Sequence, residues 1–473
     1  MNLNALRFDV TPGIRTIPDK ISRIIGWFDC GMRVSLTAVF SISAYLVFAH
    51  ATADHYSRQQ TQKGIRRAIH WEPWNSVHYA DLARGLERPL KEGDLPAVIR
   101  LYEKAVQLNP RDAGYWVRLG QAYEWAGRTE EAKIATEQAR NLAPMSPAMN
   151  WTIGNFYLRQ GETERALGAF QKTILAEPEM RRPAFDLAWR ATGNGQLIAQ
   201  TMIPAQTDIY FEYLDYLLAA KQLDEAEKIW ARIVDSNIHY EPAKAFSYLD
   251  ALIQQGRIGQ LAAAWSALES MTSFSKRGGT SDGNLVTNGD FQAEILNGGL
   301  DWRINPASGA TVDIDNSDSR GGVASLRIRF DGKQNLSDEL IFQYVPVVPD
   351  TSYHFAAFMR AYGITTDSGP RFQIRDAAAP DKFFLQSSDM VGTSSWLLRK
   401  IDFKAGPETS LLEIRVTRLA SAKLDNRIAG TAWVKGVQLT AIESASDSNR
   451  LHQSTRSKAM LPSSVVLQVE PAP

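Results

Sequence analysis

The spacing of apolar residues along the chain changes twice, and each pattern predicts a different kind of structure. Residues 34–53 (VSLTAVFSISAYLVFAHATA) form an apolar run without a formal charge. Between about residues 70 and 271, apolar residues recur at the intervals of amphipathic helices. From residue 284 they alternate with polar residues in short runs bounded by Gly, Asp, Pro and Asn, as in strands. The chain is therefore predicted to be a multidomain α plus β protein.

The apolar run at residues 34–53 is long enough to cross a bilayer as a helix. A cleaved secretory signal is the alternative, because Ala49 to Ala51 (AHA) and Ala51 to Ala53 (ATA) both fit a small-x-small cleavage site. The leader of about 33 residues is long for such a signal, which favours a retained transmembrane helix. Residues 1–33 are expected to be a cytoplasmic or interfacial segment, with apolar residues on one helical face: Ile17, Ile21, Ile24, Ile25 and Phe28.

A 34-residue repeat runs through the helical region. Trp116, Leu119 and Tyr123 lie on one helical stripe. Gly120 and Ala132 are small residues at positions where the paired helices must approach closely. The residues that recur after 34 positions are Gly120, Gly127, Ala132 and Pro144, which are answered by Gly154, Gly161, Ala166 and Pro178. This pattern resembles the tetratricopeptide repeat family. We count five units from about Val77 to Met271, interrupted by an irregular stretch at residues 181–206.

The resemblance implies that the first helix of each unit lines a concave groove for an extended peptide or a partner helix. The alternative is that Trp125 and Trp151 pack between repeats, and that Asn155 and Arg159 are solvated surface. The residues that we expect to form the protein-binding groove are Gln121, Glu124, Trp125, Trp151, Asn155 and Arg159.

The last region opens with residues 284–291 (NLVTNGDF), followed by Trp302, and carries SLRI from Ser325, QYVPV from Gln343 and WVKGVQL from Trp433. These segments resemble carbohydrate-binding modules of the jelly-roll (galactose-binding-like) group, which bind xylan and related glucans. The resemblance covers residues 284–442 and implies a β-sandwich.

Sugar binding needs an aromatic ring against the apolar face of a pyranose, with polar groups that read its hydroxyls. The alternatives are that Trp302 and Trp396 pack in the core, and that the module is a plain protein-contact domain. The residues that we expect to bind carbohydrate are Tyr362, Gln343, Arg360, Gln373 and Trp396.

A structural calcium ion is conceivable from the resemblance, but Gln292 and Lys435–Gly436 stand where the family has acidic ligands. We predict no cofactor and no metal site. Another acidic cluster, Asp313, Asp315 and Asp318, is read as a solvated turn. The seven histidines are scattered, and a nucleophile-elbow match at residues 279–283 (GTSDG) lies in a linker, so we predict no enzyme.

The equal numbers of basic and acidic residues argue against nucleic acid as a partner and exclude little else. Lys plus Arg and Asp plus Glu number 52 each, so no basic excess is present to bind a phosphate backbone. The positive charges flanking residues 34–53 are balanced and leave orientation open. By analogy with the sugar modules, we expect a single-pass inner-membrane protein whose C-terminal domains lie in the periplasm.

The expected domains are segment 1–33, span 34–53, repeats 70–271, linker 272–283, sandwich 284–442 and disordered tail 443–473. We expect a membrane-anchored scaffold that binds a protein through its repeats and a glycan or a second protein through its sandwich, in bacterial envelope or exopolysaccharide assembly. Two alternatives remain: a polysaccharide receptor whose repeats are a spacer, and a subunit of a glycan-processing enzyme.

Overall fold

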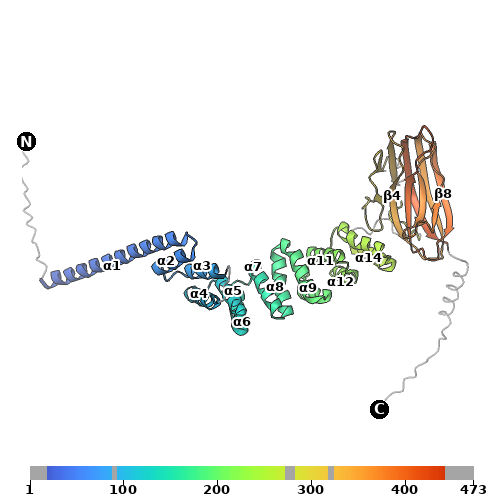
Figure 1. Ribbon diagram of the computed structural model, residues 1–473. Coiled ribbons are helices and arrows are strands. Elements are labelled where there is room, and N and C mark those ends of the chain that lie inside the picture. Colours follow the sequence, from blue (N-terminus) through green and yellow to red (C-terminus); the bar gives the residue numbers. More distant parts are fainter. Residues whose placement is uncertain (1–18, 88–92, 272–282, 318–323, 443–473) are drawn as a thin grey trace, which may run out of the picture. The chain divides into compact units, whose positions relative to one another are not determined.

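The computed structural model describes residues 19–87, 93–271, 283–317 and 324–442, with side chains from residue 35 (Figure 1). The predicted tail, most of the linker, Asp318 and the first 18 residues lie outside this range. The described chain divides into two compact units, residues 1–184 and 185–473, each taken by itself below. The combination of helical repeats and a β-sandwich confirms the predicted fold class.

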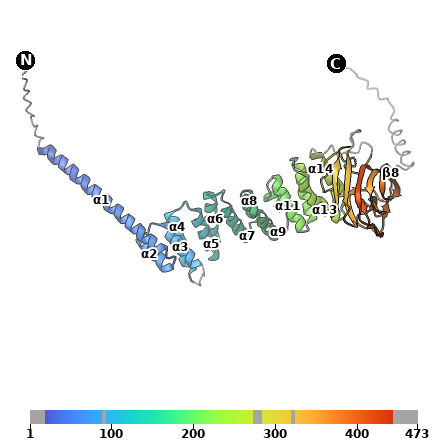
Figure 2. The same ribbon diagram turned by 90° about the horizontal axis from the view of Figure 1, so that it is seen from above.

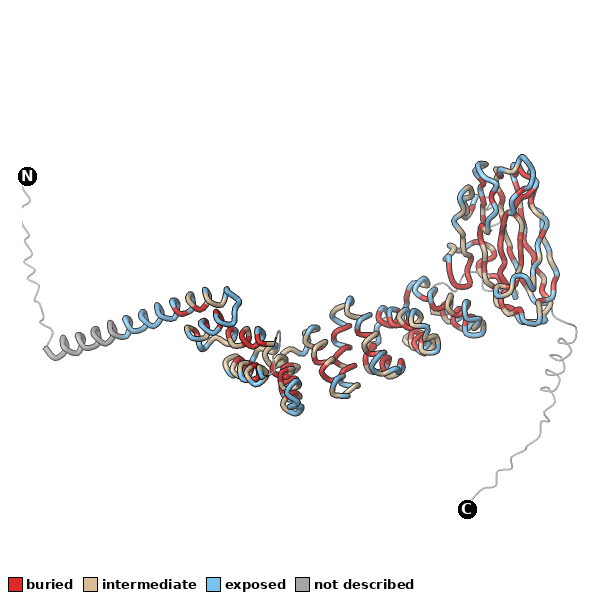
Figure 3. Tube along the Cα trace, in the orientation of Figure 1, coloured by how far each residue is buried: buried red, intermediate tan, exposed pale blue. Residues whose placement is uncertain are grey.

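Helix α1 (Asp19–Ser57) contains the predicted span and begins well before it. Its Ser35–Ser57 portion has a mean hydropathy of 1.5 and is long and apolar enough to cross a membrane. From residue 35 onward, Figure 3 shows this helix largely exposed until its last turns. Ala49 and Ala53, in those turns, are buried. The exposed large side chains of the helix are Leu36, Val39, Phe40, Ile42, Tyr45, Leu46, Val47 and Phe48. An apolar surface of this extent in water would be costly, although a signal sequence has the same composition.

Five regular pairs of antiparallel helices follow α2 (Gln62–Trp71), as the 34-residue period predicted. Partners such as α5 and α6, or α7 and α8, lie side by side in Figures 1 and 2. The pairs are α3 (Ser76–Glu87) with α4 (Leu95–Leu108), α5 (Ala113–Trp125) with α6 (Thr129–Leu142), α7 (Pro147–Arg159) with α8 (Thr163–Ala176), α11 (Thr207–Ala219) with α12 (Leu223–Asp235), and α13 (Phe246–Gln254) with α14 (Ile258–Met271).

The repeated glycines have two separate tasks. Gly127 and Gly161 end the first helix of their pairs with φ of +70° and +74°, a left-handed conformation that favours glycine. Gly120 and Gly154 instead allow close packing within a pair. A Cβ at Gly154 would lie 2.5 Å from the ring of Phe170, and one at Gly120 would lie 2.9 Å from Oγ1 of Thr136.

The irregular stretch at residues 181–206 contains α9 (Arg181–Thr192) and the seven-residue α10 (Gly195–Thr201). The short 3-10 helix η1 (Pro178–Met180) precedes it, and a second one, η2 (Pro242–Ala245), lies between α12 and α13. Asn194 caps α10 by accepting a hydrogen bond from the Leu197 amide at 3.0 Å. Gly193 and Asn194 separate the two helices, so this unit departs from the regular pattern as expected.

The C-terminal sandwich consists of two five-stranded antiparallel sheets. We call the sheet with order β1-β4-β9-β6-β7 sheet A, and the sheet with order β2-β3-β10-β5-β8 sheet B. The strands of sheet A are β1 (Arg303–Ile304), β4 (Asp338–Pro346), β9 (Leu411–Arg418), β6 (Arg371–Asp376) and β7 (Phe384–Gln386). Those of sheet B are β2 (Ala310–Asp315), β3 (Ser325–Asp331), β10 (Ala429–Ala441), β5 (Ser352–Ile364) and β8 (Gly392–Lys404).

The sandwich core fills with alternate residues of both sheets, drawn red along the strands in Figure 3. Trp302 is completely buried there; its indole donates to the Asn288 carbonyl at 3.2 Å and packs near Phe291. Arg418 is also fully buried, and its guanidinium donates to Asn335 at 2.6 Å and to the Asn426 carbonyl at 3.1 Å. These buried polar groups are hydrogen-bonded, as stability requires.

The compact units do not follow the expected domain boundary at residues 272–283. Their division falls between Ala184 and Phe185, inside α9, so the second unit holds the last helices together with the sandwich. Contacts explain this grouping: Arg303 of β1 donates to Asp250 of α13 at 2.5 Å. Gly299 also packs so tightly that a Cβ there would lie 2.3 Å from the ring of Trp265 on α14.

Candidate binding surfaces of the repeats and the sandwich

The surface expected to bind a protein partner contains an ion pair between successive repeats. Arg159 on α7 donates to both carboxylate oxygens of Glu124 on α5, at 2.9 and 3.0 Å, and Gln160 donates to the same carboxylate at 3.3 Å. These residues come from the last turns of two first helices, which the repeat places next to each other. Glu124 and Arg159 therefore form an ion pair with each other in the absence of a partner.

The other residues expected to form the groove differ in how far their side chains are exposed. Trp125 is 49% exposed, whereas the ring of Trp151 packs 5.1 Å from that of Phe170 within its own repeat. The Asn155 amide donates to the Trp151 carbonyl at 2.8 Å, and Asn155 and Gln121 are both half-buried. Trp125 is thus the large apolar side chain that this surface offers most freely.

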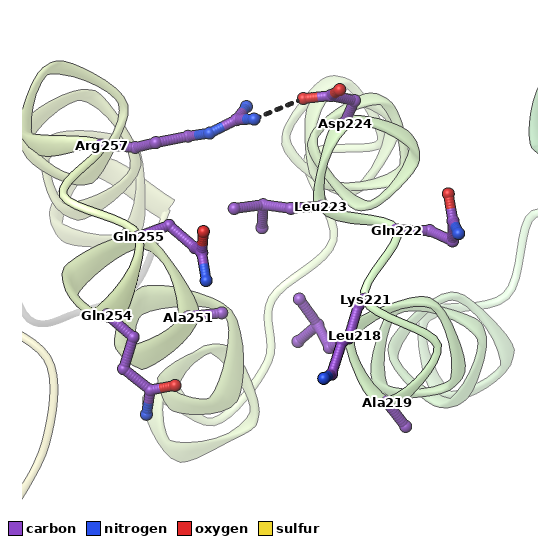
Figure 4. A pocket seen from close by; sticks show the side chains of 10 residues that line it. All are labelled: Leu218, Ala219, Lys221, Gln222, Leu223, Asp224, Ala251, Gln254, Gln255 and Arg257. Carbon is purple, nitrogen blue, oxygen red and sulfur yellow. Dashed lines mark ion pairs between the residues drawn. The ribbon is translucent and has the colours of Figure 1, made fainter.

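A pocket of about 540 Å³ lies further along the repeats, between the turns of α11–α12 and α13–α14 (Figure 4). Its lining is rich in amides, including Gln222, Gln254 and Gln255. Arg257 reaches across one side to Asp224 at 2.6 Å. No sequence pattern indicates this pocket, because its lining residues come from two turns that each resemble an ordinary polar connection between helices.

Sheet A carries two rows of polar and aromatic side chains on the face turned away from the core. Residues directly opposite each other across strands share a face, so the register defines both rows. The first row is Phe342, Arg415, Gln373 and Gln386, and the second is Tyr344, Glu413, Arg375 and Phe384. We call these eight residues the sheet A face.

The charges of the sheet A face are matched within it and by one neighbour, Glu339. Arg375 lies 2.8 Å from Glu413 and 3.2 Å from Glu339, and Arg415 pairs with Glu339 and donates to Gln373 at 2.9 Å. Burial lowers the pKa of the Arg415 guanidinium. The pKa of Tyr344 is raised, chiefly by burial and then by the Glu413 charge. The result is a nearly neutral surface that is rich in donors and acceptors.

Two guanidinium nitrogens beside this surface, Nε of Arg371 and Nε of Arg375, are buried and have no hydrogen-bond partner among the described residues. Buried polar donors are usually satisfied, and those that are not call for a ligand or solvent partner. Phe384, at the β7 edge, is 46% exposed. The surface therefore offers an aromatic ring beside polar groups, which is the combination that sugar recognition requires.

Sheet B has a different outer surface. Arg360 lies opposite Trp433 on the neighbouring strand, with its guanidinium 4.9 Å from the indole, and the Lys435 amine lies 4.2 Å from the Trp396 ring. A hollow of about 380 Å³ is lined by Arg360, Ala361, Tyr362, Thr393, Ser394, Ser395 and Trp396. We call it the sheet B hollow.

The structure separates the five residues expected to bind carbohydrate. Tyr362, Arg360 and Trp396 meet at the sheet B hollow, whereas Gln373 lies on the sheet A face, with its side chain buried between neighbours. Gln343 is in the core: its amide accepts from the Thr287 amide at 3.1 Å and donates to the Thr287 carbonyl at 2.8 Å. A surface ligand cannot reach Gln343, so it is removed from the expected site.

Sequence reasoning did not single out Glu413, Arg415, Phe342 or Tyr344. The signal was the alternation of charged and apolar residues on β9 (EIR in LLEIRVTR) together with RFQIR on β6. Such alternation is usually taken for a solvated face, but here neighbouring strands bury the charges against one another.

No group of His, Cys, Asp or Glu within the described ranges could hold a metal ion. The acidic pair Asp313 and Asp315 instead binds Arg327, at 2.6 and 3.1 Å. The pKa of Asp315 is lowered by hydrogen bonds from Ser317 and from the Trp433 indole. This cluster is thus a set of ion pairs between β2 and β3, joined to β10 by the hydrogen bond from Trp433.

Comparison with known proteins supports the helical assignment at residues 90–150, which match the family model of the tetratricopeptide repeat. No curated protein matches the sequence. Among solved structures, the chain is similar to a tetratricopeptide repeat protein from Parabacteroides merdae, with 14% identity, a TM-score of 0.28, and coverage of 49% of this chain and 95% of that one.

Two further solved structures are similar to part of the chain. The CBM22-1 xylan-binding domain from Paenibacillus barcinonensis has 13% identity and a TM-score of 0.24, with coverage of 33% of this chain and 93% of that one. The enzymatically active domain of tailspike protein 4 of bacteriophage CBA120 has 15% identity and a TM-score of 0.26, with coverage of 34% of this chain. The chain spans 22% of that tailspike structure.

The chain thus combines tetratricopeptide repeats with a jelly-roll sandwich like that of carbohydrate-binding modules.

Proposed function

We propose that this protein is a non-enzymatic scaffold, held at a membrane by α1, whose repeats bind a protein partner and whose sandwich binds a glycan. The setting that would use all three parts is bacterial envelope or exopolysaccharide assembly, with the repeats and the sandwich on the periplasmic side of the inner membrane. The observation that carries the glycan assignment is the sheet A face, where matched charges, amides and aromatic rings stand in two rows.

A neutral glycan is the ligand that this surface fits best. Each guanidinium there already has a carboxylate partner, so an added charge on the ligand would find no counterion. Sugar hydroxyls, in contrast, both donate and accept, and they suit a surface where amide, guanidinium and carboxylate groups alternate. The exposed Phe384 ring supplies the apolar contact.

The glycan assignment is tested by affinity electrophoresis of the purified full chain, in detergent, through gels containing neutral plant or bacterial glucans. We expect retardation that Phe384→Ala weakens by about tenfold in apparent affinity, because one stacking ring is lost. Phe358→Ala is the matched control, since Phe358 is 40% exposed but lies on sheet B. If no neutral glycan retards the wild-type chain, the glycan assignment fails.

The protein partner is assigned to the surface around Trp125, because a half-exposed aromatic ring beside polar residues is a common binding anchor. In-cell crosslinking and co-purification should capture a partner that Trp125→Ala releases. Trp74→Ala is the matched control: Trp74 is 46% exposed and lies outside the helix pairs. Identical captured proteins for wild type and Trp125→Ala would instead favour a polysaccharide receptor whose repeats act as a spacer.

A further inference from the structure

Helix α2 turns back along the last turns of α1, and the two lie side by side in Figures 1 and 2. Near the start of α2, a Cβ added at Gly64 would lie 2.6 Å from the carbonyl oxygen of Tyr56 on α1. At the end of α2, the ring centre of Trp71 lies 5.7 Å from that of Phe48. Positions that rise along α2 thus meet positions that fall along α1, so the helices are antiparallel. Helix α2 therefore returns toward the apolar portion of α1.

The exposed apolar surface of α1 ends where α2 meets it. Phe48 is exposed, whereas Ala49 and Ala53 beyond it are buried. His50 Nδ1 lies 3.0 Å from Oε1 of Glu72, the residue at the C-cap of α2. The last turns of α1 are thus part of the folded helical unit. A bilayer crossed by the apolar portion of α1 would therefore end near Phe48.

A buried carboxylate holds the turn between α2 and α3 at this level. Glu72 also lies 3.0 Å from Nε2 of His78 on α3 and accepts a hydrogen bond from the Asn75 amide at 2.9 Å. Burial acts to raise the pKa of Glu72, but the hydrogen bonds with the amide and with both histidines outweigh burial and lower this pKa. The turn at residues 72–77 is therefore fixed beside the point where α1 would leave the bilayer.

This turn exposes large apolar side chains. Trp74 and Val77 are 46% and 48% exposed, although the buried Glu72 and His78 lie next to them in the chain. The Tyr79 hydroxyl donates to the Pro73 carbonyl at 3.1 Å and helps to fix the loop that carries Trp74. Tryptophan is enriched at membrane interfaces, because its ring is apolar and its N–H is polar. Such side chains beside a spanning helix suit the lipid headgroup region.

Two cations on α2 lie behind the turn. Lys63 and Arg66 are exposed, and neither has an ion-pair partner among the residues that the structure describes. Arg66 lies about 8 Å from Trp71 along the helix axis, at a rise of about 1.5 Å per residue. Cations this close to a bilayer surface are attracted to anionic headgroups, within a Debye length of about 8 Å at physiological salt.

We propose that the turn at residues 72–77 is a membrane-contact surface, which sets Trp74 and Val77 among the lipid headgroups beside the exit of α1. The contact holds the first helix pair, α3 and α4, against the bilayer. This inference rests on the proposed anchoring of the chain by α1, and it goes beyond that role because a simple tether needs no such contact. Since α1 still anchors the chain without it, capture of a partner at Trp125 should not depend on Trp74.

The test is a depth measurement on the purified full chain, reconstituted in phosphatidylcholine vesicles. Cys30→Ser removes the single native thiol, and Val77→Cys carries a nitrobenzoxadiazole label. The vesicles contain or lack a lipid with a nitroxide on its headgroup, which quenches a label that it touches. We expect the nitroxide lipid to reduce the fluorescence of the Val77 label by about twofold or more, as for a group within the headgroup region.

The contribution of the ring is tested with the Val77 label in place. Trp74→Glu should abolish most of the quenching, because a carboxylate is not stabilised at the interface, whereas Trp74→Phe should retain it. The matched control label is Ile134→Cys, since Ile134 is another exposed large apolar residue, on α6. The Ile134 label should be little quenched.

Anionic lipid tests the part played by the cations. Phosphatidylglycerol in the vesicles should increase the quenching of the Val77 label at low salt, because it attracts Lys63 and Arg66. The double variant Lys63→Gln with Arg66→Gln should remove this increase. An increase that the double variant retains would mean that these cations do not face the bilayer.

The outcomes separate the contact from the anchor. A chain that does not float with the vesicles in a density gradient would defeat the proposed anchoring and this inference with it. A chain that floats, but whose Val77 label is quenched no more than the Ile134 label, would defeat the contact alone. Full quenching in Trp74→Glu would also overturn it. Circular dichroism of each variant establishes that it is folded.

Discussion

Arg159 and Glu124, 35 positions apart in the sequence, form a two-pronged ion pair that joins the first helices of successive repeats. The sequence suggested these side chains as contacts for a protein partner. Their mutual hydrogen bonds mean that a charged partner would have to compete with an existing pair. The ion pair instead fixes the spacing of α5 and α7, which leaves Trp125 beside it as the more accessible contact.

A charge exchange at this pair tests its structural role. Arg159→Glu should lower the stability of the repeats by about 1 kcal/mol, because it places two carboxylates together at a half-exposed site. The double variant Glu124→Arg with Arg159→Glu should recover most of this loss in a urea titration followed by circular dichroism. A double variant no more stable than Arg159→Glu alone would mean that the pair does not couple the repeats.

Two glycines of the α7–α8 pair, Gly154 and Gly168, provide a sharper test of helix packing. Gly154→Ala should destabilise the repeats by about 1–3 kcal/mol, because its Cβ would overlap the Phe170 ring. Gly168→Ala, on α8, is the matched control: nothing lies within 4 Å of its added Cβ, so helix propensity should make it stabilising by up to about 1 kcal/mol. Thermal unfolding of both variants measures the difference, and equal shifts would contradict the packing explanation.

The contrast between these glycines also shows what the sequence could predict. The recurrence of Gly120 as Gly154 indicated close helix approach, because a repeat must solve the same packing problem in each unit. The turn glycines Gly127 and Gly161 were equally predictable, since helix ends favour the left-handed conformation. The Glu124–Arg159 pair was not, because charged residues near helix ends have many partners within reach.

Strand alternation predicted the sandwich, but it could not divide the outer residues between two faces. Tyr362 and Gln373 were grouped as one site, although they lie on different sheets. Gln343 looked like surface, and it is buried because Thr287, 56 residues earlier in the chain, offers its amide two hydrogen bonds. Such pairings depend on strand order, and sequence spacing does not encode strand order.

Glu269 on α14 faces an acidic neighbour in the loop before β1. Burial, together with the charge of Asp301, raises the pKa of Glu269, while a hydrogen bond from Trp265 opposes the rise. A raised carboxyl pKa means that stability is greatest below the unfolded-state pKa and is lost as pH rises through the folded-state value. Glu269→Gln should therefore raise the thermal unfolding midpoint at about pH 7.

The gain from Glu269→Gln should vanish below about pH 4, where the wild-type carboxyl is protonated in both the folded and the unfolded state. The glutamine can still accept the hydrogen bond of the Trp265 indole, which lies 3.0 Å from the carboxylate. Glu164→Gln on α8, whose carboxyl lies at an exposed helix start, is the control and should show no such gain. A gain that is the same at both pH values would exclude ionisation as its cause.

The proposed anchoring role of α1 makes a prediction about membrane extraction. Leu46→Arg places a charge near the middle of the apolar portion and should cost about 3 kcal/mol for insertion at a bilayer centre. The variant should shift from the membrane pellet to the soluble fraction after alkaline carbonate washing, whereas Leu46→Val should not. Mass spectrometry of the wild-type chain decides the signal alternative, since loss of the first 51 or 53 residues would mean cleavage.

Asp315 should make the sandwich sensitive to acid. Hydrogen bonds from Ser317 and from the Trp433 indole lower its pKa, so the folded state favours the carboxylate more than the unfolded chain does. A lowered carboxyl pKa contributes stability above the unfolded-state value, and that stability is lost as pH falls through the folded-state value. For an aspartate the loss should therefore begin near about pH 4 and grow below it.

Asp315→Asn should lower the unfolding midpoint at about pH 7 by an amount equivalent to roughly 1 kcal/mol, since an amide replaces a charged acceptor. The difference from wild type should shrink as pH falls below about 4, because the wild-type carboxylate is then being protonated as well. Asp331→Asn, on the neighbouring strand, is the control, and tryptophan fluorescence during urea unfolding reports both. A difference that stays the same below about pH 4 would mean that ionisation of Asp315 is not its cause.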